Sequence, residues 1–99
     1  MVKINWTMRA ADDLQEIAEY IALDKPDAAA DFVAKLLKSV EQLAEFPFKG
    51  RIVPELQSAR YREVIFTPCR IIYTPEGDSV IIQRIIRGEQ KMRQGLLPP

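Results

Sequence analysis

The sequence predicts an α+β domain in which an antiparallel helical hairpin packs on a mainly antiparallel sheet of about four strands, in the order β-α-α-β-β-β. Two observations support this prediction. Apolar residues recur at helical spacing along residues 8–23 and 26–46. Residues 61–87 instead contain three short runs rich in isoleucine, valine and aromatic residues. With 99 residues and 47% hydrophobic content, residues 1–99 are expected to form one domain with a single modest core.

The first half of the chain predicts one strand and two helices. Residues 2–6 alternate apolar and polar side chains, which is typical of a short half-buried strand. Thr7 is a suitable N-cap for an amphipathic helix over residues 8–23, because its side-chain oxygen can accept a hydrogen bond from the first turn. Pro26 ends this helix and opens a second one that runs to about Phe46, since proline disfavours helical geometry in the residue before it and suits the first turn of a helix.

The second half predicts a loop followed by three strands. Residues 47–58 break the helical pattern and show no period, which indicates a loop. Residues 61–87 predict an antiparallel meander with tight turns at Thr67-Pro68 and at residues 75–78, where proline fixes φ and glycine supplies a positive φ. Residues 88–94 are predicted to form a short C-terminal helical turn.

The strand residues are assigned to two faces if Phe66 pairs with Cys69 and Thr74 pairs with Ser79, because successive side chains alternate. The predicted core face holds Val64, Phe66, Cys69, Ile71, Tyr73, Val80, Ile82 and Ile86. Arg62 and Arg84 join it at its edges, where they are expected to reach solvent or acidic helix residues. The predicted open face holds Tyr61, Glu63, Ile65, Arg70, Ile72, Ile81, Gln83, Ile85 and Arg87.

The predicted open face is unusual for a solvated sheet surface because it mixes four isoleucines with two arginines. Solvated sheet faces are normally polar, so we expect something to cover this one. A one-residue bulge would exchange the two sets of residues beyond it.

The residue types present exclude several kinds of chemistry. The chain has no histidine and a single cysteine, Cys69, so an internal disulfide, the usual zinc sites and histidine-based acid–base catalysis are excluded. We expect neither a cofactor nor a metal ion. No run reaches about 18 apolar residues and no secretory signal pattern is present, so a cytoplasmic protein without membrane contact is expected.

Charge is unevenly distributed along a chain whose formal net charge is zero. Residues 1–46 carry five Lys or Arg and nine Asp or Glu, a balance of −4, whereas residues 47–99 carry nine and five, a balance of +4. The neutral total argues against a generic nucleic-acid binder. Two interpretations remain open, a basic strand surface that meets an acidic partner and ordinary solvated helix faces with scattered arginines.

Short sequence words along nearly the whole chain carry a resemblance to a known family. The first group comprises Trp6, Ala10-Ala11, Asp13-Leu14, Ile17 and Tyr20-Ile21. The second comprises Leu43 through Pro47, Gly50-Arg51 and Val53-Pro54-Glu55. The third comprises Tyr61-Arg62-Glu63, Arg70-Ile71-Ile72-Tyr73, an acidic turn and an isoleucine-rich last strand. In this order and spacing they resemble the RelE/ParE superfamily of bacterial toxin–antitoxin toxins, and within it the ParE branch.

The resemblance implies a small toxin that is neutralised by a cognate ParD-like or RelB-like antitoxin, whose partly disordered segment wraps across it. The ParE branch is described as acting on DNA gyrase by trapping its cleaved-DNA complex. The RelE branch instead cleaves mRNA on the ribosome. These are different classes of activity, so particular residues must distinguish them.

RNA cleavage through the 2′-OH needs a general base, a general acid and cations that stabilise the phosphate charge. By the resemblance, Arg70 matches the strand arginine that RelE-like nucleases use for this stabilisation, and Arg87 stands where many members carry histidine. No tyrosine or histidine follows Tyr73, and arginine cannot act as a base at neutral pH. A nuclease would therefore depend on Arg70, Glu63 and Arg87. We favour a cross-strand ion pair between Glu63 and Arg70, so no catalytic residue is expected.

The favoured hypothesis is a gyrase inhibitor that acts by protein–protein contact. A RelE-like mRNA endonuclease is the alternative, and a family member without toxic activity is a second alternative. Direct sequence-specific binding to nucleic acid is not expected. The antitoxin or the target is expected to bind the predicted open face at Tyr61, Ile65, Arg70, Ile72, Ile81, Ile85 and Arg87.

Overall fold

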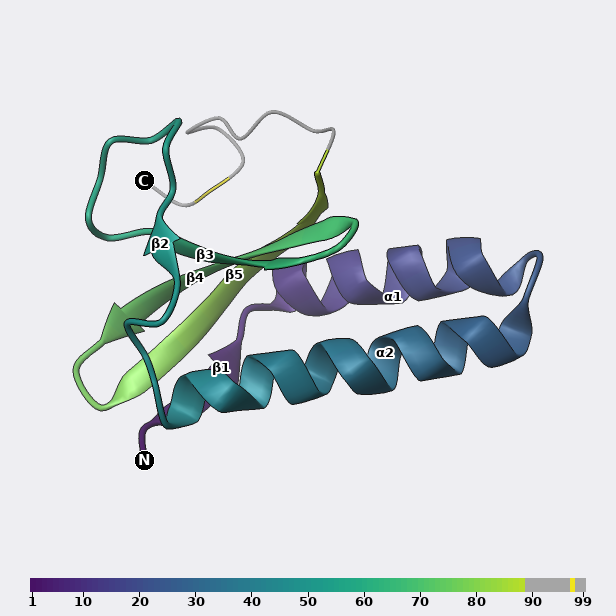
Figure 1. Ribbon diagram of the computed structural model, residues 1–99, viewed down its shortest axis with the longest axis horizontal. Helices are drawn as coiled ribbons and strands as arrows, with labels where there is room; N and C mark the ends of the chain where they lie inside the picture. The colour runs from purple at the N-terminus through teal and green to yellow at the C-terminus, as the bar shows by residue number, and fades with distance from the viewer. Residues whose placement is uncertain (89–96, 98–99) are drawn as a thin grey trace.

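Two antiparallel helices cover one face of a five-stranded sheet in the computed structural model, which describes residues 1–88 and Leu97 (Figure 1). The elements are β1 (Lys3–Trp6), α1 (Met8–Ala22), α2 (Pro26–Glu41), the 3-10 turn η1 (Gln42–Ala44), β2 (Arg51–Ile52), β3 (Arg62–Phe66), β4 (Cys69–Glu76) and β5 (Ser79–Arg87). The predicted α+β class and helical hairpin are confirmed, and the sheet has one strand more than predicted. The predicted helical turn over residues 88–94 lies almost entirely outside the described residues.

Both helices begin at the predicted residues. The Thr7 hydroxyl oxygen accepts a hydrogen bond of 3.0 Å from the Ala10 N–H and so caps α1. Pro26 is the first residue of α2. This helix ends at Glu41, before the predicted Phe46, and continues as η1. Within the described residues, no helix combines the length and the apolar composition needed to cross a membrane.

The strand order is β1-β5-β4-β3-β2, in which β1 runs parallel to β5 and the other neighbours are antiparallel. The predicted Phe66–Cys69 pairing is confirmed, and the Thr67-Pro68 peptide bond between these two residues is cis. The predicted Thr74–Ser79 pairing is wrong, because Ser79 pairs with Glu76 and leaves a two-residue turn. Gly77 adopts a φ of 60° in this turn, which glycine accepts without a steric cost.

The strand β2 was predicted as part of a loop. Its two residues pair with Glu63 and Arg62 of β3, but two residues are too few to show a period in the sequence. Gly50 precedes β2, and its N–H donates a 2.8 Å hydrogen bond to the Tyr73 hydroxyl oxygen. A Cβ at residue 50 would lie 2.5 Å from the Glu63 carbonyl oxygen and 2.7 Å from the Tyr73 ring. The close approach of these strands therefore requires a glycine.

A β-bulge in β5 changes the assignment of its last residues to the two faces. Ile72 pairs with Arg84 and Tyr73 pairs with Ile82, so Gln83 is the extra residue. Beyond the bulge, Ile85 belongs to the core beneath the helices and Ile86 to the cluster on the other face. The predicted faces of these two isoleucines are therefore wrong, since the prediction assumed an unbroken alternation.

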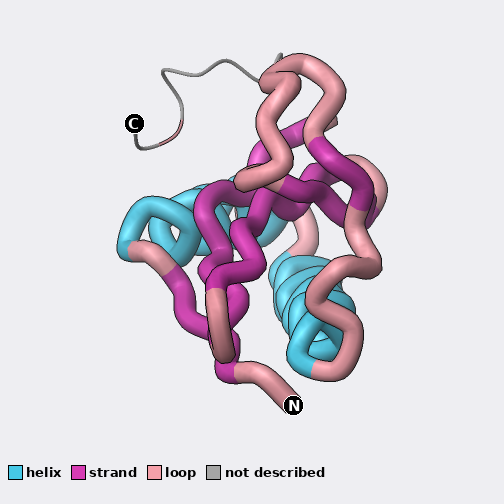
Figure 2. Tube along the Cα trace, turned by 90° about the vertical axis from the view of Figure 1, so that its left-hand side faces the viewer, coloured by secondary structure: helices cyan, strands magenta, loops and turns pink. Residues whose placement is uncertain are grey.

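Apolar side chains are buried on both faces of the sheet. The larger core lies between the helices and the sheet and includes Leu36, Val40, Leu43, Ile71, Tyr73, Ile82 and Ile85. The smaller one lies on the other face and consists of Val53, Tyr61, Ile72, Ile86 and Leu97, with Leu56 packed against it. The loop between β2 and β3 supplies Val53 and Leu56, and it rises at the top of Figure 2, away from the helices. The chain itself thus covers much of the face that was predicted to be open.

Candidate functional site

Four charged side chains form a continuous ion-pair network on the sheet face opposite the helices. One carboxylate oxygen of Glu63 in β3 accepts a hydrogen bond from the Arg51 Nε at 2.6 Å. The other accepts one from the Arg70 Nε at 2.7 Å. Arg70 of β4 also donates from both terminal nitrogens to the two oxygens of Glu55, at 2.8 Å each. Charges of opposite sign therefore alternate along the network, which we call the Arg51–Glu63–Arg70–Glu55 network.

Strand register brings this network together. Glu63 lies directly opposite Arg51 and, because Ile65 pairs with Arg70, diagonally opposite Arg70. The predicted diagonal relation and the ion pair between Glu63 and Arg70 are both confirmed. The sequence did not indicate Glu55 as the third partner, since it belongs to the loop after β2, where no periodic pattern places a side chain.

The two central residues of the network, Glu63 and Arg70, are shielded from solvent. Glu63 is 2% exposed and Arg70 is 9% exposed, so both charges depend on their partners rather than on water. The hydrogen bonds from Arg70 to Glu55 and then to Glu63 raise the pKa of Arg70, against the opposing effect of burial. Arg70 is therefore a fixed cation, and its guanidinium is already engaged by carboxylates.

A shallow pocket of about 390 Å³ lies beside the network. Ile65 borders it and is 54% exposed. The residues that line the pocket are Arg51, Glu55, Ile65, Thr67, Pro68, Cys69, Arg70 and Gly88. This pocket therefore brings together two of the predicted binding residues, Arg70 and Ile65.

Arg87 does not join Arg70 and Glu63. Its guanidinium carbon lies 5.8 Å from the centre of the Tyr20 ring of α1, on the helix side of the sheet. The bulge at Gln83 explains this position, because it turns the residues that follow it to the other face. The set of three residues predicted for a nuclease is therefore not assembled on one surface.

Most of the predicted binding residues are buried. Tyr61 and Ile72 belong to the smaller core, and Ile85 belongs to the larger one. Ile81, opposite Thr74, is half-buried. Ile65 is the exposed isoleucine of the predicted set, so the expectation of a broad open isoleucine surface is wrong. The apolar residues Val53 and Leu56 in the predicted loop were the available signal that the chain covers this face.

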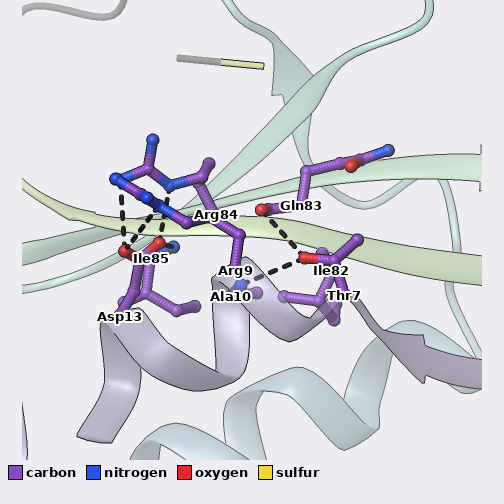
Figure 3. A network of polar contacts seen from close by, with 8 residues as sticks. All are labelled: Thr7, Arg9, Ala10, Asp13, Ile82, Gln83, Arg84 and Ile85. Atoms are coloured by element: carbon purple, nitrogen blue, oxygen red, sulfur yellow. Dashed lines mark hydrogen bonds and ion pairs between the residues drawn. The ribbon is translucent and has the colours of Figure 1, made fainter. Parts of the chain in front are cut away.

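A second polar network joins the start of α1 to the bulge in β5 (Figure 3). One carboxylate oxygen of Asp13 accepts hydrogen bonds from the Arg84 Nε at 2.7 Å and from the Ile85 N–H at 3.0 Å. The other accepts from Arg84 Nη2 at 3.1 Å. Arg84 thus reaches an acidic helix residue, as predicted. The role of Asp13 was not predicted, because its partners lie more than 70 residues away in the sequence.

Thr7 supports the same junction. Its hydroxyl lies 3.1 Å from the Ile82 carbonyl oxygen and 3.2 Å from that of Gln83, while its oxygen accepts from Ala10 (Figure 3). The Asp13–Arg84 pair also lines a pocket of about 380 Å³ that Tyr20 and Arg87 border. The described residues contain no cluster of acidic or cysteine side chains that could hold a metal ion.

Comparison with known proteins identifies consistent relatives. A family model described as the ParE toxin of the type II toxin–antitoxin system parDE matches residues 4–92. The toxin RelE2 of Caulobacter vibrioides is 35% identical over 79 residues, which cover 78% of this chain and 85% of that protein. Y4kP of Sinorhizobium fredii, described as a candidate toxin, is 51% identical over 49 residues. This match covers 50% of the chain and 51% of Y4kP, so it spans about half the length of that relative.

The fold also matches a solved structure. A chain of the chromosomal ParDE toxin–antitoxin system from P. aeruginosa superimposes with a TM-score of 0.78 and 25% sequence identity. The match covers 90% of this chain and 98% of that one. The two-layer arrangement of helical hairpin and sheet is therefore shared with that protein.

Proposed function

The chain belongs to the ParE toxin family of type II toxin–antitoxin systems, and we propose that it inhibits DNA gyrase by protein–protein contact and is neutralised by a cognate antitoxin. Membership in this family supports the role of a toxin that has a cognate antitoxin. The choice of gyrase depends on the chemistry that the described residues offer.

The state of Glu63 is the observation that supports an inhibitor over a nuclease. A general base must lie within hydrogen-bond reach of the proton that it removes. Both oxygens of Glu63 already accept hydrogen bonds from arginines, and the side chain is almost completely buried. The chain has no histidine to replace it. Binding another protein requires none of these proton transfers.

A gyrase assay tests this proposal directly. Purified protein added to gyrase should inhibit supercoiling and accumulate the cleaved-DNA complex, while mRNA in a parallel translation reaction should stay intact. Glu63→Gln keeps the shape of the side chain and removes its charge, so a folded variant should still inhibit gyrase. Cleaved mRNA together with unaffected gyrase would contradict the proposal.

Ribosome-dependent mRNA cleavage remains the second candidate because Arg70 and Glu63 lie together, as the nuclease alternative requires, and because one relative is named RelE2. On this alternative, Glu63→Gln should abolish cleavage. Primer-extension mapping of mRNA from the translation reaction distinguishes the two candidates.

The proposed antitoxin contact centres on Ile65 and the pocket beside it. Arg51 is exposed at the rim of this pocket, so an acidic group of the antitoxin can approach it without displacing a buried residue. The half-buried Ile81 remains an outer contact in this proposal, whereas Arg87, on the helix side of the sheet beside Tyr20, is not part of the contact. Arg70 lines the pocket, whereas Tyr61 and Ile72 are buried in the smaller core and Ile85 in the larger one, so these three are not direct contacts in this proposal.

Ile65→Asp is predicted to weaken antitoxin binding by about tenfold or more, because it places a carboxylate in an apolar contact. Ile52→Asp is the matched control. Ile52 is 43% exposed, and its pairing with Arg62 places it on the other face of the sheet. Calorimetric titration with the antitoxin measures both variants. Equal weakening by both substitutions would show that Ile65 is not at the contact.

A further inference from the structure

The pocket of about 380 Å³ between α1 and the end of β5 is rich in charged side chains. Five of its eight lining residues are charged, namely Arg9, Asp13, Glu16, Arg84 and Arg87. Those from α1 are spaced three and four residues apart, so they follow one face of that helix. None of the eight also lines the pocket proposed for the antitoxin, and so this charged pocket is a separate surface.

The charges in this pocket do not balance. Asp13 accepts two hydrogen bonds from Arg84, so these two charges neutralise each other (Figure 3). Glu16 supplies one further negative charge, whereas Arg9 and Arg87 supply two further positive charges. The pocket therefore has a formal charge of +1, and one added carboxylate would neutralise it.

The two remaining arginines are accessible to a partner. The side chain of Arg9 is 68% exposed and approaches Asp13 only at 3.8 Å. Arg87 is also exposed, and its guanidinium carbon lies 5.8 Å from the centre of the Tyr20 ring. Tyr20 is itself 67% exposed. An incoming side chain can therefore meet two cations and an aromatic ring without displacing a buried residue, and tyrosine and arginine are the residue types that contribute most at protein interfaces.

The surroundings of the pocket indicate which kind of anion it suits. Helix α1 carries one Lys or Arg and four Asp or Glu, so the surface next to the pocket is acidic. An extended polyanion such as DNA would bring many of its phosphates close to these carboxylates, which repel them. A single Asp or Glu of a protein brings one negative charge to the pocket alone. The charge distribution thus favours an acidic protein segment over nucleic acid.

We propose that this pocket is where the toxin binds an acidic segment of DNA gyrase. One Asp or Glu of that segment would pair with Arg9 and Arg87, and its neighbouring apolar atoms would contact the Tyr20 ring. This inference rests on the proposed function, because it names the contact with the proposed target. It assigns gyrase to the helix side of the sheet and leaves the pocket beside Ile65 to the antitoxin.

Arg87→Glu and Lys35→Glu form a matched pair of variants. Both reverse the charge of one exposed cation, but Lys35 lies on α2 outside the pocket. Arg87→Glu is expected to raise the concentration needed for half-inhibition of supercoiling by about tenfold, and Lys35→Glu by less than about twofold. Biolayer interferometry with immobilised gyrase and no DNA should show the same ratio in affinity. The affinity of Arg87→Glu for the antitoxin should stay within about twofold of the native value.

Arg9→Glu tests the pocket from its other side. The exposed Arg9 makes only the 3.8 Å approach to Asp13, so its replacement should leave the fold intact. This variant is expected to weaken gyrase inhibition by about tenfold as well. It keeps the proposal testable if circular dichroism shows that Arg87→Glu does not fold.

The possible results separate this inference from the proposed function. If the native chain leaves gyrase unaffected, both fail. If the native chain inhibits gyrase and both pocket variants inhibit it equally well, only the inference is overturned. An effect of Arg87→Glu that appears only when DNA is present would assign the pocket to a DNA phosphate instead. Antitoxin binding that Arg87→Glu weakens tenfold would assign it to the antitoxin, and either of these two results also overturns the inference.

Discussion

Asp13 is the residue on which the junction between helix and sheet depends most. Its carboxylate accepts two hydrogen bonds from the buried Arg84 and a third from the backbone of Ile85. Removal of one partner of a buried pair leaves the other charge without compensation, which costs more than the pair itself contributes.

Asp13→Ala is therefore predicted to lower the free energy of unfolding by about 3–5 kcal/mol. Arg9→Ala is its control, because the exposed Arg9 approaches Asp13 only at 3.8 Å and should contribute less than about 1 kcal/mol. Urea denaturation of both variants measures these changes. A loss below about 1 kcal/mol for Asp13→Ala would contradict the assigned role.

The burial of Tyr73 leads us to expect that the stability of the chain decreases at alkaline pH. Burial raises the pKa of its hydroxyl above the usual 10.0, although the hydrogen bond from Gly50 opposes this effect. Because the unfolded chain then loses the Tyr73 proton more readily than the folded chain, this contribution to stability is complete below pH 10 and is lost as pH rises through the folded-state pKa.

Tyr73→Phe should cost about 1 kcal/mol at neutral pH through the lost hydrogen bond to Gly50. Its destabilisation relative to the native chain should shrink as pH rises above about 10, since phenylalanine does not titrate. Urea titrations of both proteins across this range provide the measurement. A difference that stays constant with pH would show that Tyr73 ionises equally in both states.

At the scale of elements, the bulge in β5 decides which side chains face the helices. It places both Arg84 and Ile85 on the helix side, and Ile86 in the smaller core. The Gln83 side chain remains on the other face, where it donates a 3.2 Å hydrogen bond to the Thr74 hydroxyl.

Deletion of Gln83 is predicted to unfold the chain or lower its stability by more than about 3 kcal/mol, because either Ile85 or Ile86 would lose its buried position. Gln83→Ala keeps the register and removes one hydrogen bond, so it should cost only about 1 kcal/mol. Thermal unfolding compares the two variants. A deletion variant as stable as Gln83→Ala would show that the register is not fixed at this point.

The bulge also marks where prediction from the sequence stops. The helix starts, the meander and the faces up to Ile82 follow from local signals, namely a cap, two prolines and strict alternation. The faces beyond Ile82 depend on Asp13, which binds β5 from a position 71 residues earlier in the chain. Local patterns contain no information about such a distant partner, and so the positions of Ile85 and Arg87 were mispredicted.

The prediction of the candidate site was only partly correct, because it too relied on local patterns. Glu63 and Arg70 lie on neighbouring strands, so strand alternation and turn length were enough to bring them together. Glu55 and the apolar residues Val53 and Leu56 belong to the irregular loop after β2, whose path no period predicts. Their contacts neutralise Arg70 and bury Ile72, and they convert the predicted open surface into a largely covered one.

At the scale of the whole molecule, the charge is divided between an acidic helical half and a basic strand half. Residues 1–46 carry a balance of −4 and residues 47–99 a balance of +4. We expect such a division to direct partners of opposite charge to different halves of the chain through electrostatic attraction.

The proposed antitoxin should therefore associate with the strand half at a rate that depends on ionic strength. The association rate constant is expected to fall about tenfold between about 50 mM and about 300 mM salt, while the dissociation rate constant changes little. Stopped-flow mixing measures both constants. An association rate constant that is independent of salt would show that the basic half does not direct the encounter.

The parallel pairing of β1 with β5 constrains the order in which the chain can fold during its synthesis. Lys3 lies beside Ser79 and Trp6 beside Ile82, so β1 cannot pair with β5 until residues 79–82 have been synthesised. Contacts between such distant segments form late, because a long loop must close before they stabilise anything. A nascent chain of which only the helical hairpin has left the ribosome therefore lacks both the completed sheet and the Arg51–Glu63–Arg70–Glu55 network. The folded sheet of this toxin is therefore completed only after residues 79–82 have been synthesised.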